Sequence, residues 1–106
     1  MPTMPSPPTP RFTITFLDTA EDDLAWFRPS ERKTVYDAIM RILSTDPETE
    51  SKKRRRLRPN PIAPWELRIG EYRVFYEVVG ARKVRILAIG YKEHSDLFIR
   101  GERVQL

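Results

Sequence analysis

The stretch WELRIGEYRVFYEVV, residues 65–79, decides the fold of this chain. Apolar and polar residues alternate on both sides of Gly70-Glu71, which is typical of two strands joined by a two-residue turn with glycine first. A turn of this length pairs Arg68 with Arg73, and directly paired residues share one face of a sheet. The stretch therefore predicts a β-hairpin with one apolar face and one charged face.

The two faces of this hairpin predict different surroundings. The apolar face is expected to be covered by helices, and it holds Trp65, Leu67, Ile69, Tyr72, Val74, Tyr76 and Val78. The charged face holds Glu66, Arg68, Arg73, Phe75 and Glu77. Two opposed arginines repel each other unless an anion lies between them. Either the two glutamates neutralise the arginines in a surface ion network, or the face binds phosphate.

Upstream of the hairpin, the sequence predicts one strand and two helices. RFTITFL, residues 11–17, alternates and predicts a strand. A short helix is expected from Ala20 to a break at Pro29, because the residue before a proline avoids helical geometry. A second helix is expected near 31–44, with Ser30 as its N-cap and an apolar stripe at helical spacing. Together the two helices form a helical hairpin.

Downstream of the hairpin, VRILAIG, residues 84–90, is the most apolar segment and predicts the central strand. A small C-terminal hairpin is expected from residues 97–99 and 104–106 around Arg100-Gly101. The order β-α-α-β-β-β predicts an α+β fold: a twisted antiparallel sheet with the helical hairpin on one face and a short β-hairpin at the C-terminus.

The turn at Gly80 decides which residues of the central strand face Arg73. An even number of turn residues would place Ala88, Gly90 and Lys92 on the Arg73 face, with Leu87 and Ile89 in the core. Small residues beside cations would then leave an open, positively charged concavity. An odd number would reverse the two sets, because side chains alternate between the faces of a strand.

Composition excludes several classes of protein. The 106 residues include no cysteine and one histidine, which excludes a disulfide framework, a thiolate nucleophile and a multi-histidine metal site. No apolar run approaches the roughly 18 residues of a membrane span, and nothing resembles a signal peptide. We therefore expect a cytoplasmic protein with no cofactor and no metal. Residues 1–10 hold five prolines and no charge, which predicts a disordered tail before a single domain over 11–106.

Basic residues are concentrated in the second half of the chain. Residues 1–51 carry 5 basic and 9 acidic side chains, whereas residues 52–106 carry 14 basic and 6 acidic ones. Within the polar, proline-rich stretch 47–64, a dense run comprises Lys52, Lys53, Arg54, Arg55, Arg56 and Arg58. We expect this run to lie on a loop or at a helix end. It is either a solvated loop or the contact for a polyanionic partner, namely nucleic acid or an acidic protein segment.

These segments resemble a known family. WELRIGEYRVFYEV followed by VRILAIGYKEHSDLF resembles the RelE/ParE toxin superfamily of type II toxin–antitoxin systems. Leu57-Arg58, after the basic residues, is similar to that family's basic-Leu-x-Gly segment, with Pro59 in place of glycine. The resemblance covers residues 11–98 and implies a RelE/ParE-like fold and an antitoxin that wraps the toxin. RelE-like members cleave mRNA in the ribosomal A site, and ParE-like members poison DNA gyrase.

The resemblance also implies roles for individual residues. RNA cleavage without a metal needs a base for the 2′-hydroxyl, cations at the phosphate and an acid for the leaving oxygen. Arg73 matches the arginine that contacts the scissile phosphate, unless it only pairs with a strand glutamate. Lys92 aligns with an arginine near the leaving oxygen, or is an exposed turn lysine. Glu66 stands where RelE has lysine, and it either acts as base or pairs with Arg68.

Three further residues are compared with the family pattern. Phe98 takes the place of a stacking tyrosine, and it can stack on a base but cannot donate a proton. Tyr91 lies close to it in sequence and could supply the missing hydroxyl. His94 matches the C-terminal acid or base of some relatives, although a lone histidine in a polar turn is usually a surface residue.

Three functions remain open at this stage. The first expectation is a toxin that acts as a ribosome-dependent, metal-independent mRNA endoribonuclease. The alternatives are a ParE-like gyrase inhibitor without catalytic residues and a catalytically degenerate, non-toxic binding module. The expected partners are a cognate antitoxin, the ribosome and mRNA, and operator DNA only as the toxin–antitoxin complex.

Overall fold

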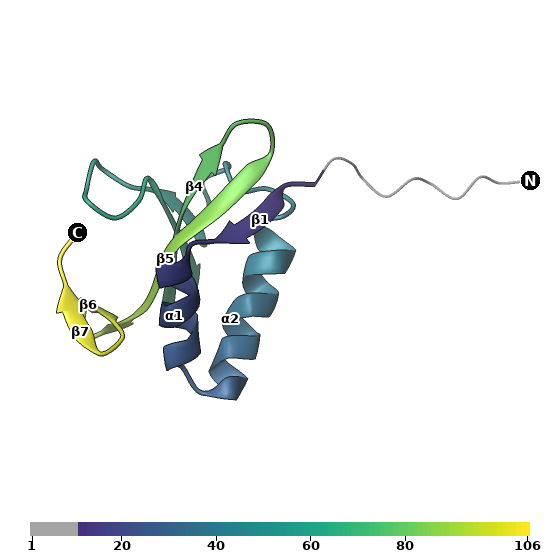
Figure 1. Cartoon of the computed structure of the whole chain (residues 1–106). Coiled ribbons are helices and arrows are strands. Elements are labelled where there is room, and N and C mark those ends of the chain that lie inside the picture. The colour runs from purple at the N-terminus through teal and green to yellow at the C-terminus, as the bar shows by residue number, and fades with distance from the viewer. Residues whose placement is uncertain (1–10) are drawn as a thin grey trace, which may run out of the picture.

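The structure is a computed structural model that describes residues 11–106 (Figure 1). The proline-rich tail expected over residues 1–10 lies outside the described residues. The elements in chain order are β1 (Thr13–Phe16), α1 (Asp18–Trp26), α2 (Pro29–Ile42), β2 (Arg54–Arg56), β3 (Trp65–Ile69), β4 (Tyr72–Val79), β5 (Lys83–Glu93), β6 (Asp96–Ile99) and β7 (Glu102–Val104). No helix within the described part of the chain is long and apolar enough to cross a membrane.

A single sheet carries the strands in the order β2-β3-β4-β5-β6-β7, and all these neighbours are antiparallel. β5 is central, as predicted. One of its edges pairs with β4, and the other pairs with β1 in parallel and with β6 further along. The two helices lie side by side on one face of the sheet (Figure 1). The predicted α+β fold with a helical hairpin is therefore confirmed.

The hairpin formed by β3 and β4 has the register that the sequence predicts. Arg68 pairs with Arg73 across the two-residue turn, so the apolar residues of both strands point toward the helices. The buried core on this side comprises Ala20, Phe27, Val35, Ile39, Leu43, Trp65, Leu67, Val74, Tyr76, Val84, Ile86 and Ile89. Each large side chain that is fully buried in this way stabilises the fold by about 1.5–3 kcal/mol.

The turn between β4 and β5 has an odd number of residues, but a bulge reverses its effect. Val79 pairs with Lys83, so three residues form the turn. The register then shifts between Phe75 and Tyr76 of β4, and Leu87 of β5 is the extra residue. Because a bulge adds one residue to one strand, it restores the parity that an even turn would have given.

As a result, the residues after the bulge lie on the faces that an even-numbered turn would have given them. Arg73 pairs with Gly90, and Phe75 pairs with Ala88, so both small residues share the Arg73 face. Ile89 lies in the helix-side core, as expected. Leu87, the bulged residue, packs on the opposite face of the sheet, where an odd turn places it.

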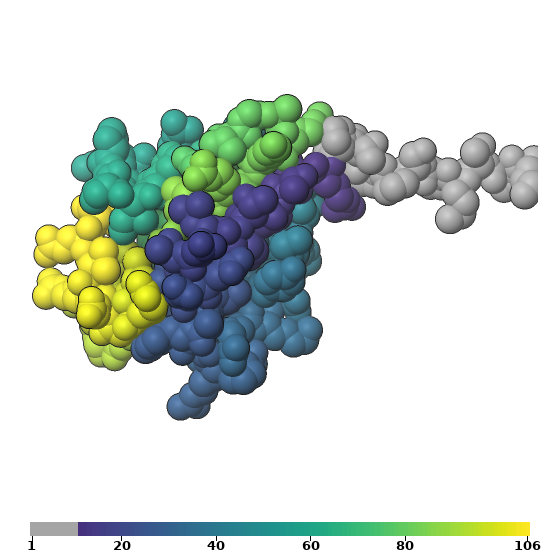
Figure 2. Space-filling model, in the orientation of Figure 1, coloured from purple at the N-terminus to yellow at the C-terminus, as the bar shows by residue number. Residues whose placement is uncertain are grey.

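A second apolar cluster covers part of the Arg73 face. Its members are Ala63, Phe75 and Leu97, with Leu57, Ile62, Leu87, Ala88 and Val104 packed around them. The loop between β2 and β3 and the C-terminal hairpin bring most of these side chains, and the two segments lie side by side (Figure 2, teal and yellow). A Cβ at Gly90 would collide with the carbonyl oxygen of Phe98. The predicted open concavity over Ala88 and Gly90 is therefore wrong, because β6 and the loop close over it.

Several element boundaries differ from the prediction. α1 begins at Asp18 rather than Ala20, and it ends at Trp26, before the proline break. Pro29 starts α2 instead of ending α1, since proline suits the first helical turn, where its missing N–H is not needed. The N-cap is Arg28, not Ser30, and the Arg28 N–H donates to the Glu31 carboxylate at 3.1 Å.

One buried carboxylate joins three elements. Asp23 of α1 is 3 % exposed and accepts a hydrogen bond from the backbone N–H of Ile89 at 3.1 Å. Its other oxygen pairs with the Nε of Arg100, in the β6–β7 turn, at 3.0 Å. This contact fills the edge of β5 between the stretches that β1 and β6 cover. Burial raises the pKa of Asp23, although Ile89 and Arg100 act in the other direction.

Replacing this carboxylate is expected to destabilise the protein. Asp23→Ala leaves the Ile89 N–H without a partner and breaks the pair with the half-exposed Arg100, so the free energy of unfolding should fall by about 2–3 kcal/mol. Urea denaturation measures the change. The control is Asp22→Ala on the same helix, at an exposed position, which should change stability by about 0.5 kcal/mol or less. Equal losses in both variants would contradict the role of Asp23.

The raised pKa of Asp23 also predicts a dependence on pH. A carboxyl whose pKa is higher in the folded state than in the unfolded chain contributes stability at low pH and loses it as pH rises through the folded pKa. The difference in unfolding free energy between the wild type and Asp23→Asn should therefore shift in favour of the wild type as pH falls from 7 toward 3.8. Urea denaturation across this range measures it. A shift in favour of the variant would contradict the assigned cause.

Candidate polyanion-binding face

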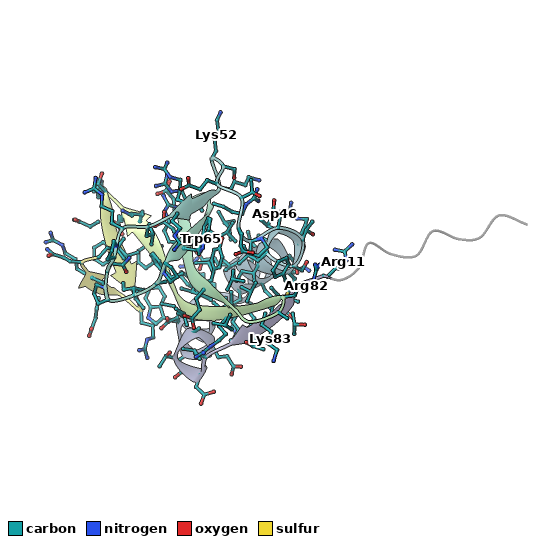
Figure 3. All side chains as sticks on the ribbon, turned by 90° about the horizontal axis from the view of Figure 1, so that it is seen from above. Arg11, Asp46, Lys52, Trp65, Arg82 and Lys83 are labelled. Atoms are coloured by element: carbon teal, nitrogen blue, oxygen red, sulfur yellow. The ribbon has the colours of Figure 1, made fainter. Side chains whose placement is uncertain are left out.

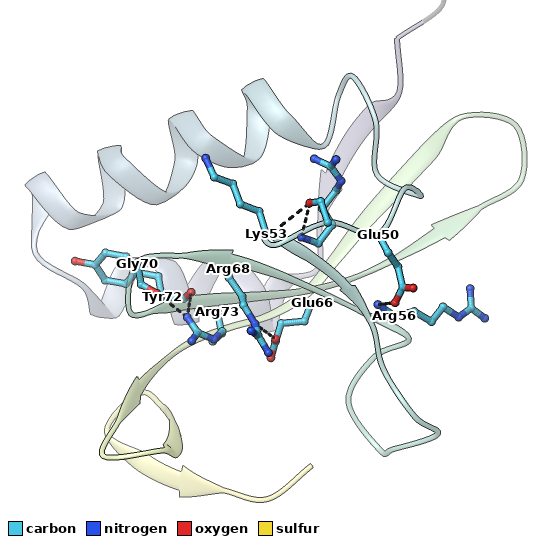
Figure 4. Close-up of polar contacts among 10 residues, drawn as sticks. Glu50, Lys53, Arg56, Glu66, Arg68, Gly70, Tyr72 and Arg73 are labelled. Atoms are coloured by element: carbon cyan, nitrogen blue, oxygen red, sulfur yellow. Dashed lines mark hydrogen bonds and ion pairs between the residues drawn. The ribbon is translucent and has the colours of Figure 1, made fainter.

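Arg73 is the second residue of β4 and lies on the face of the sheet away from the helices (Figure 4). Its guanidinium folds back on the hairpin turn, where Nη1 donates to the carbonyl oxygens of Gly70 at 2.8 Å and Tyr72 at 2.9 Å. Its Nε is buried and has no hydrogen-bond partner among the described residues. Desolvation lowers the pKa of Arg73, but a guanidinium stays protonated at physiological pH. The arginine is thus a cation with unused hydrogen-bonding capacity.

Glu66 lies on the same face and neutralises the charge of Arg68. It is 2 % exposed, and its Oε1 pairs with the Nε of Arg68 at 2.9 Å. Glu77, the other glutamate expected to take part, pairs instead with Arg85 at 3.4 Å. The sequence offered two alternatives for this face, neutralisation of the arginines by glutamates or binding of phosphate. The first is found for Arg68, which pairs with Glu66.

A third arginine joins this face through β2. Arg55 pairs with Glu66 across β2 and β3, and paired residues share a face. Three arginines, Arg55, Arg68 and Arg73, therefore lie on one face with a single buried carboxylate among them. The charge that remains is positive, so the arrangement can hold an anion.

The other predicted catalytic residues are not gathered here. Tyr91 pairs with Tyr72, which puts it on the helix side of the sheet, and its ring stacks on those of Trp26 and Phe98, with ring centroids 5.7 and 5.4 Å away. His94 lies exposed in the turn between β5 and β6. The structure brings Glu66 beside Arg73 and leaves Tyr91, His94 and Phe98 elsewhere.

Lys92 lies at the edge of the face that carries Arg73. Two residues after Gly90 on β5, it has the register position of the Arg73 face, and its backbone N–H donates to the carbonyl oxygen of Glu71 at 2.8 Å. Its side chain lines a hollow of about 300 Å³ at the C-terminal hairpin, together with Asp96 and Arg103. It therefore lies at the end of the charged face, away from the Arg68–Glu66 pair.

The basic run does not form one patch. Residues 54–56 form a strand rather than the expected loop or helix end, because they pair with β3. Arg54 and Arg56 consequently face the helix side, where Arg56 lies over the ring of Trp65 at 5.6 Å and Arg54 Nε donates to the carbonyl oxygen of Thr49 at 2.7 Å. Lys52 points away from the body of the molecule (Figure 3), and Lys53 and Arg58 are also exposed. Pairing with β3 thus divides the cations between two faces and a loop.

Residues 14–95 match the family described as the ParE toxin of the type II toxin–antitoxin system parDE. The chain belongs to this family. Its fold is similar to the crystal structure of the toxin–antitoxin complex RelBE2 from Mycobacterium tuberculosis, with a TM-score of 0.67, 25 % sequence identity and coverage of 77 % of this chain and 99 % of that chain. No curated protein sequence matches it. The predicted membership of the RelE/ParE superfamily is confirmed, and the protein is the toxin of a type II module.

Glu66, the buried carboxylate among Arg55, Arg68 and Arg73, gives a prediction with two measurable effects. Glu66→Gln removes the buried charge, so stability should fall by about 1–3 kcal/mol, while affinity for a single-stranded oligonucleotide should rise several-fold at low salt because the cations are no longer offset. Urea denaturation and fluorescence anisotropy measure the two effects. Glu77→Gln removes the same charge beside Arg85 and should leave affinity nearly unchanged. A uniform rise in both variants would mean that the arginine face is not the binding surface.

Proposed function

We propose that this toxin is held inactive by a cognate antitoxin and that it acts by binding its target rather than by cutting RNA. The similarity to a chain from a toxin–antitoxin complex supports the partner. The match to the ParE family supports DNA gyrase as the target, because the ParE-like members that the sequence resembles poison that enzyme. Operator DNA is a partner only of the toxin–antitoxin complex.

The observation that carries this proposal is the separation of the candidate acid and base groups. Cleavage of a phosphodiester needs a base, an acid and cations around one phosphate. Among the described residues, two carboxylates act on Arg73: Glu66 is almost completely buried and paired with Arg68, and Glu71 lies exposed in the hairpin turn. Tyr91 lies on the opposite face of the sheet, and His94 lies in an exposed turn. A cationic face without an assembled acid–base pair suits binding better than catalysis.

A second function has one observation in its favour. Arg73 and Glu66 share a face, so a cation and a carboxylate are close enough for the carboxylate to raise the pKa of the arginine. A ribosome-dependent mRNA endoribonuclease could use this pair if the ribosome supplied the positioning and the missing acid. In that case the ribosome and mRNA are the partners, as the sequence first suggested.

One experiment separates the two functions. We expect that expression without an antitoxin stops growth, that the purified toxin inhibits supercoiling by gyrase, and that primer extension finds mRNA intact. Arg73→Ala should relieve the arrest if Arg73 contacts the target. The control is Arg41→Ala, at an exposed position on α2, which should stay toxic.

Two other results would contradict this proposal. Codon-linked mRNA cuts that disappear in Arg73→Ala, with normal supercoiling, would establish the endoribonuclease and refute the binding mechanism. Normal growth during expression of the wild type would instead identify a non-toxic member of the family.

A further inference from the structure

We propose that a groove beside the loop 57–64 binds an acidic peptide segment of the antitoxin and anchors it through an aliphatic side chain. The inference rests on the proposed function only in naming the antitoxin as the protein that carries the segment. The groove has a volume of about 470 Å³, and its walls include Arg56, Leu57, Arg58, Ile62, Glu77 and Leu87.

The groove lies on the side of the sheet that the helices leave uncovered. Its floor is part of the second apolar cluster, to which Ile62 and Leu87 belong. In Figure 4 the loop after Arg56 descends on this side, away from the helices. The groove is therefore separate from the helical hairpin, and it lies next to the arginine face.

The wall of the groove is ordered before any ligand binds. The side chain of Asn60 donates to the carbonyl oxygens of Arg58 at 2.7 Å and Ala63 at 2.8 Å. Its Oδ1 accepts from the N–H groups of Ile62 at 2.8 Å and Ala63 at 3.0 Å. These four bonds use the full hydrogen-bonding capacity of the amide, and three prolines in the loop restrict its backbone further. A preorganised wall reduces the entropy that binding costs.

The floor suits an aliphatic side chain. Leu57, Ile62 and Leu87 are branched aliphatic residues, and each keeps part of its surface open. The groove offers no aromatic ring on which a nucleobase could stack. Leucine, isoleucine, valine or methionine would bury apolar surface here, so a peptide fits better than RNA.

The charge at the rim of the groove favours an acidic peptide. Arg58 is exposed, and its guanidinium makes no ion pair or hydrogen bond among the described residues. The guanidinium of Arg56 lies over Trp65 on the helix side, and the carboxylate of Glu77 is already paired with Arg85. The unpaired charge at the rim is therefore positive. Carboxylates on either side of an aliphatic anchor would meet it.

The test is an NMR titration of the full-length, isotope-labelled toxin with two synthetic peptides. One has a single leucine flanked by glutamates, and the other has alanine in its place. The leucine peptide should shift the amide signals of Ile62, Ala63 and Leu87, and it should bind about tenfold more tightly than the alanine peptide because more apolar surface is buried. Equal affinities, or shifts confined to Lys52 and Lys53, would overturn the proposal, as would no binding at all.

Two variants with the same change of charge sharpen this test. Arg58→Glu reverses a charge at the rim of the groove, whereas Lys52→Glu reverses one on the exposed part of the run. We expect Arg58→Glu to weaken the leucine peptide about tenfold and Lys52→Glu to have a much smaller effect. Equal weakening would indicate diffuse attraction and overturn the groove. So would a single-stranded RNA that shifts the groove amides more strongly than the peptide.

Failure of this inference and failure of the proposed function give different results. Peptide binding is measured on purified protein, so its absence leaves growth arrest and gyrase inhibition untouched. Conversely, a chain that proves non-toxic can still bind the peptide. If the antitoxin neutralises wild type and Arg58→Glu equally well in cells, the antitoxin stands as a partner and the groove does not.

Discussion

The β-bulge at Leu87 determines which side chains of the central strand face Arg73. The three-residue turn before β5 would by itself place Ile89 opposite Arg73, and the extra residue moves Gly90 there instead. Ile86 and Ile89 then point into the helix-side core, while Leu87 and Ala88 both reach the other face. The placement of Ile89 in the core and of Leu87 at the floor of the peptide groove both depend on this one insertion.

A gap in the strand pairing of β5 explains why a charged residue is buried in α1. Strand β5 has no β-partner on one edge between the stretches that pair with β1 and β6. The N–H of Ile89 points to that gap, and a buried N–H without an acceptor is costly. Asp23 provides the acceptor and also holds Arg100, so the C-terminal hairpin is tied to the helix layer. The desolvation of Asp23 is the cost of this connection.

The electrostatics of the arginine face favour binding over chemistry. Three arginines surround one buried carboxylate on this face, and Glu77 is paired with Arg85, which leaves a positive surface with little capacity for proton transfer. The aromatic residues that the sequence placed near the phosphate instead form a stack with Trp26 on the other side of the sheet. A fold shared by toxins with different targets leaves such side chains to determine the activity.

The hairpin over residues 65–79 could be predicted from sequence because its signals are local: strict alternation and a glycine at the first turn position. The strand character of Arg54–Arg56 could not, since three arginines show no apolar period and become a strand only by pairing with β3. The role of Asp23 was equally hidden, because Asp22 beside it has the same side chain. The bulge arises from the pairing of β4 with β5, so the number of residues in the turn could not predict which β5 side chains face Arg73. The groove could not be predicted either, because the loop 57–64 and Leu87 come together only in the folded chain.

The register of β4 against β5 is therefore the measurement that tests this account most directly. Cross-strand NOEs in the labelled protein report it. We predict contacts between Arg73 and Gly90 and between Phe75 and Ala88, together with contacts between Tyr76 and Ile86 beyond the bulge. Contacts of Arg73 with Ile89 and of Phe75 with Leu87 would show an uninterrupted ladder, and would contradict the faces assigned to the β5 residues after Ile86.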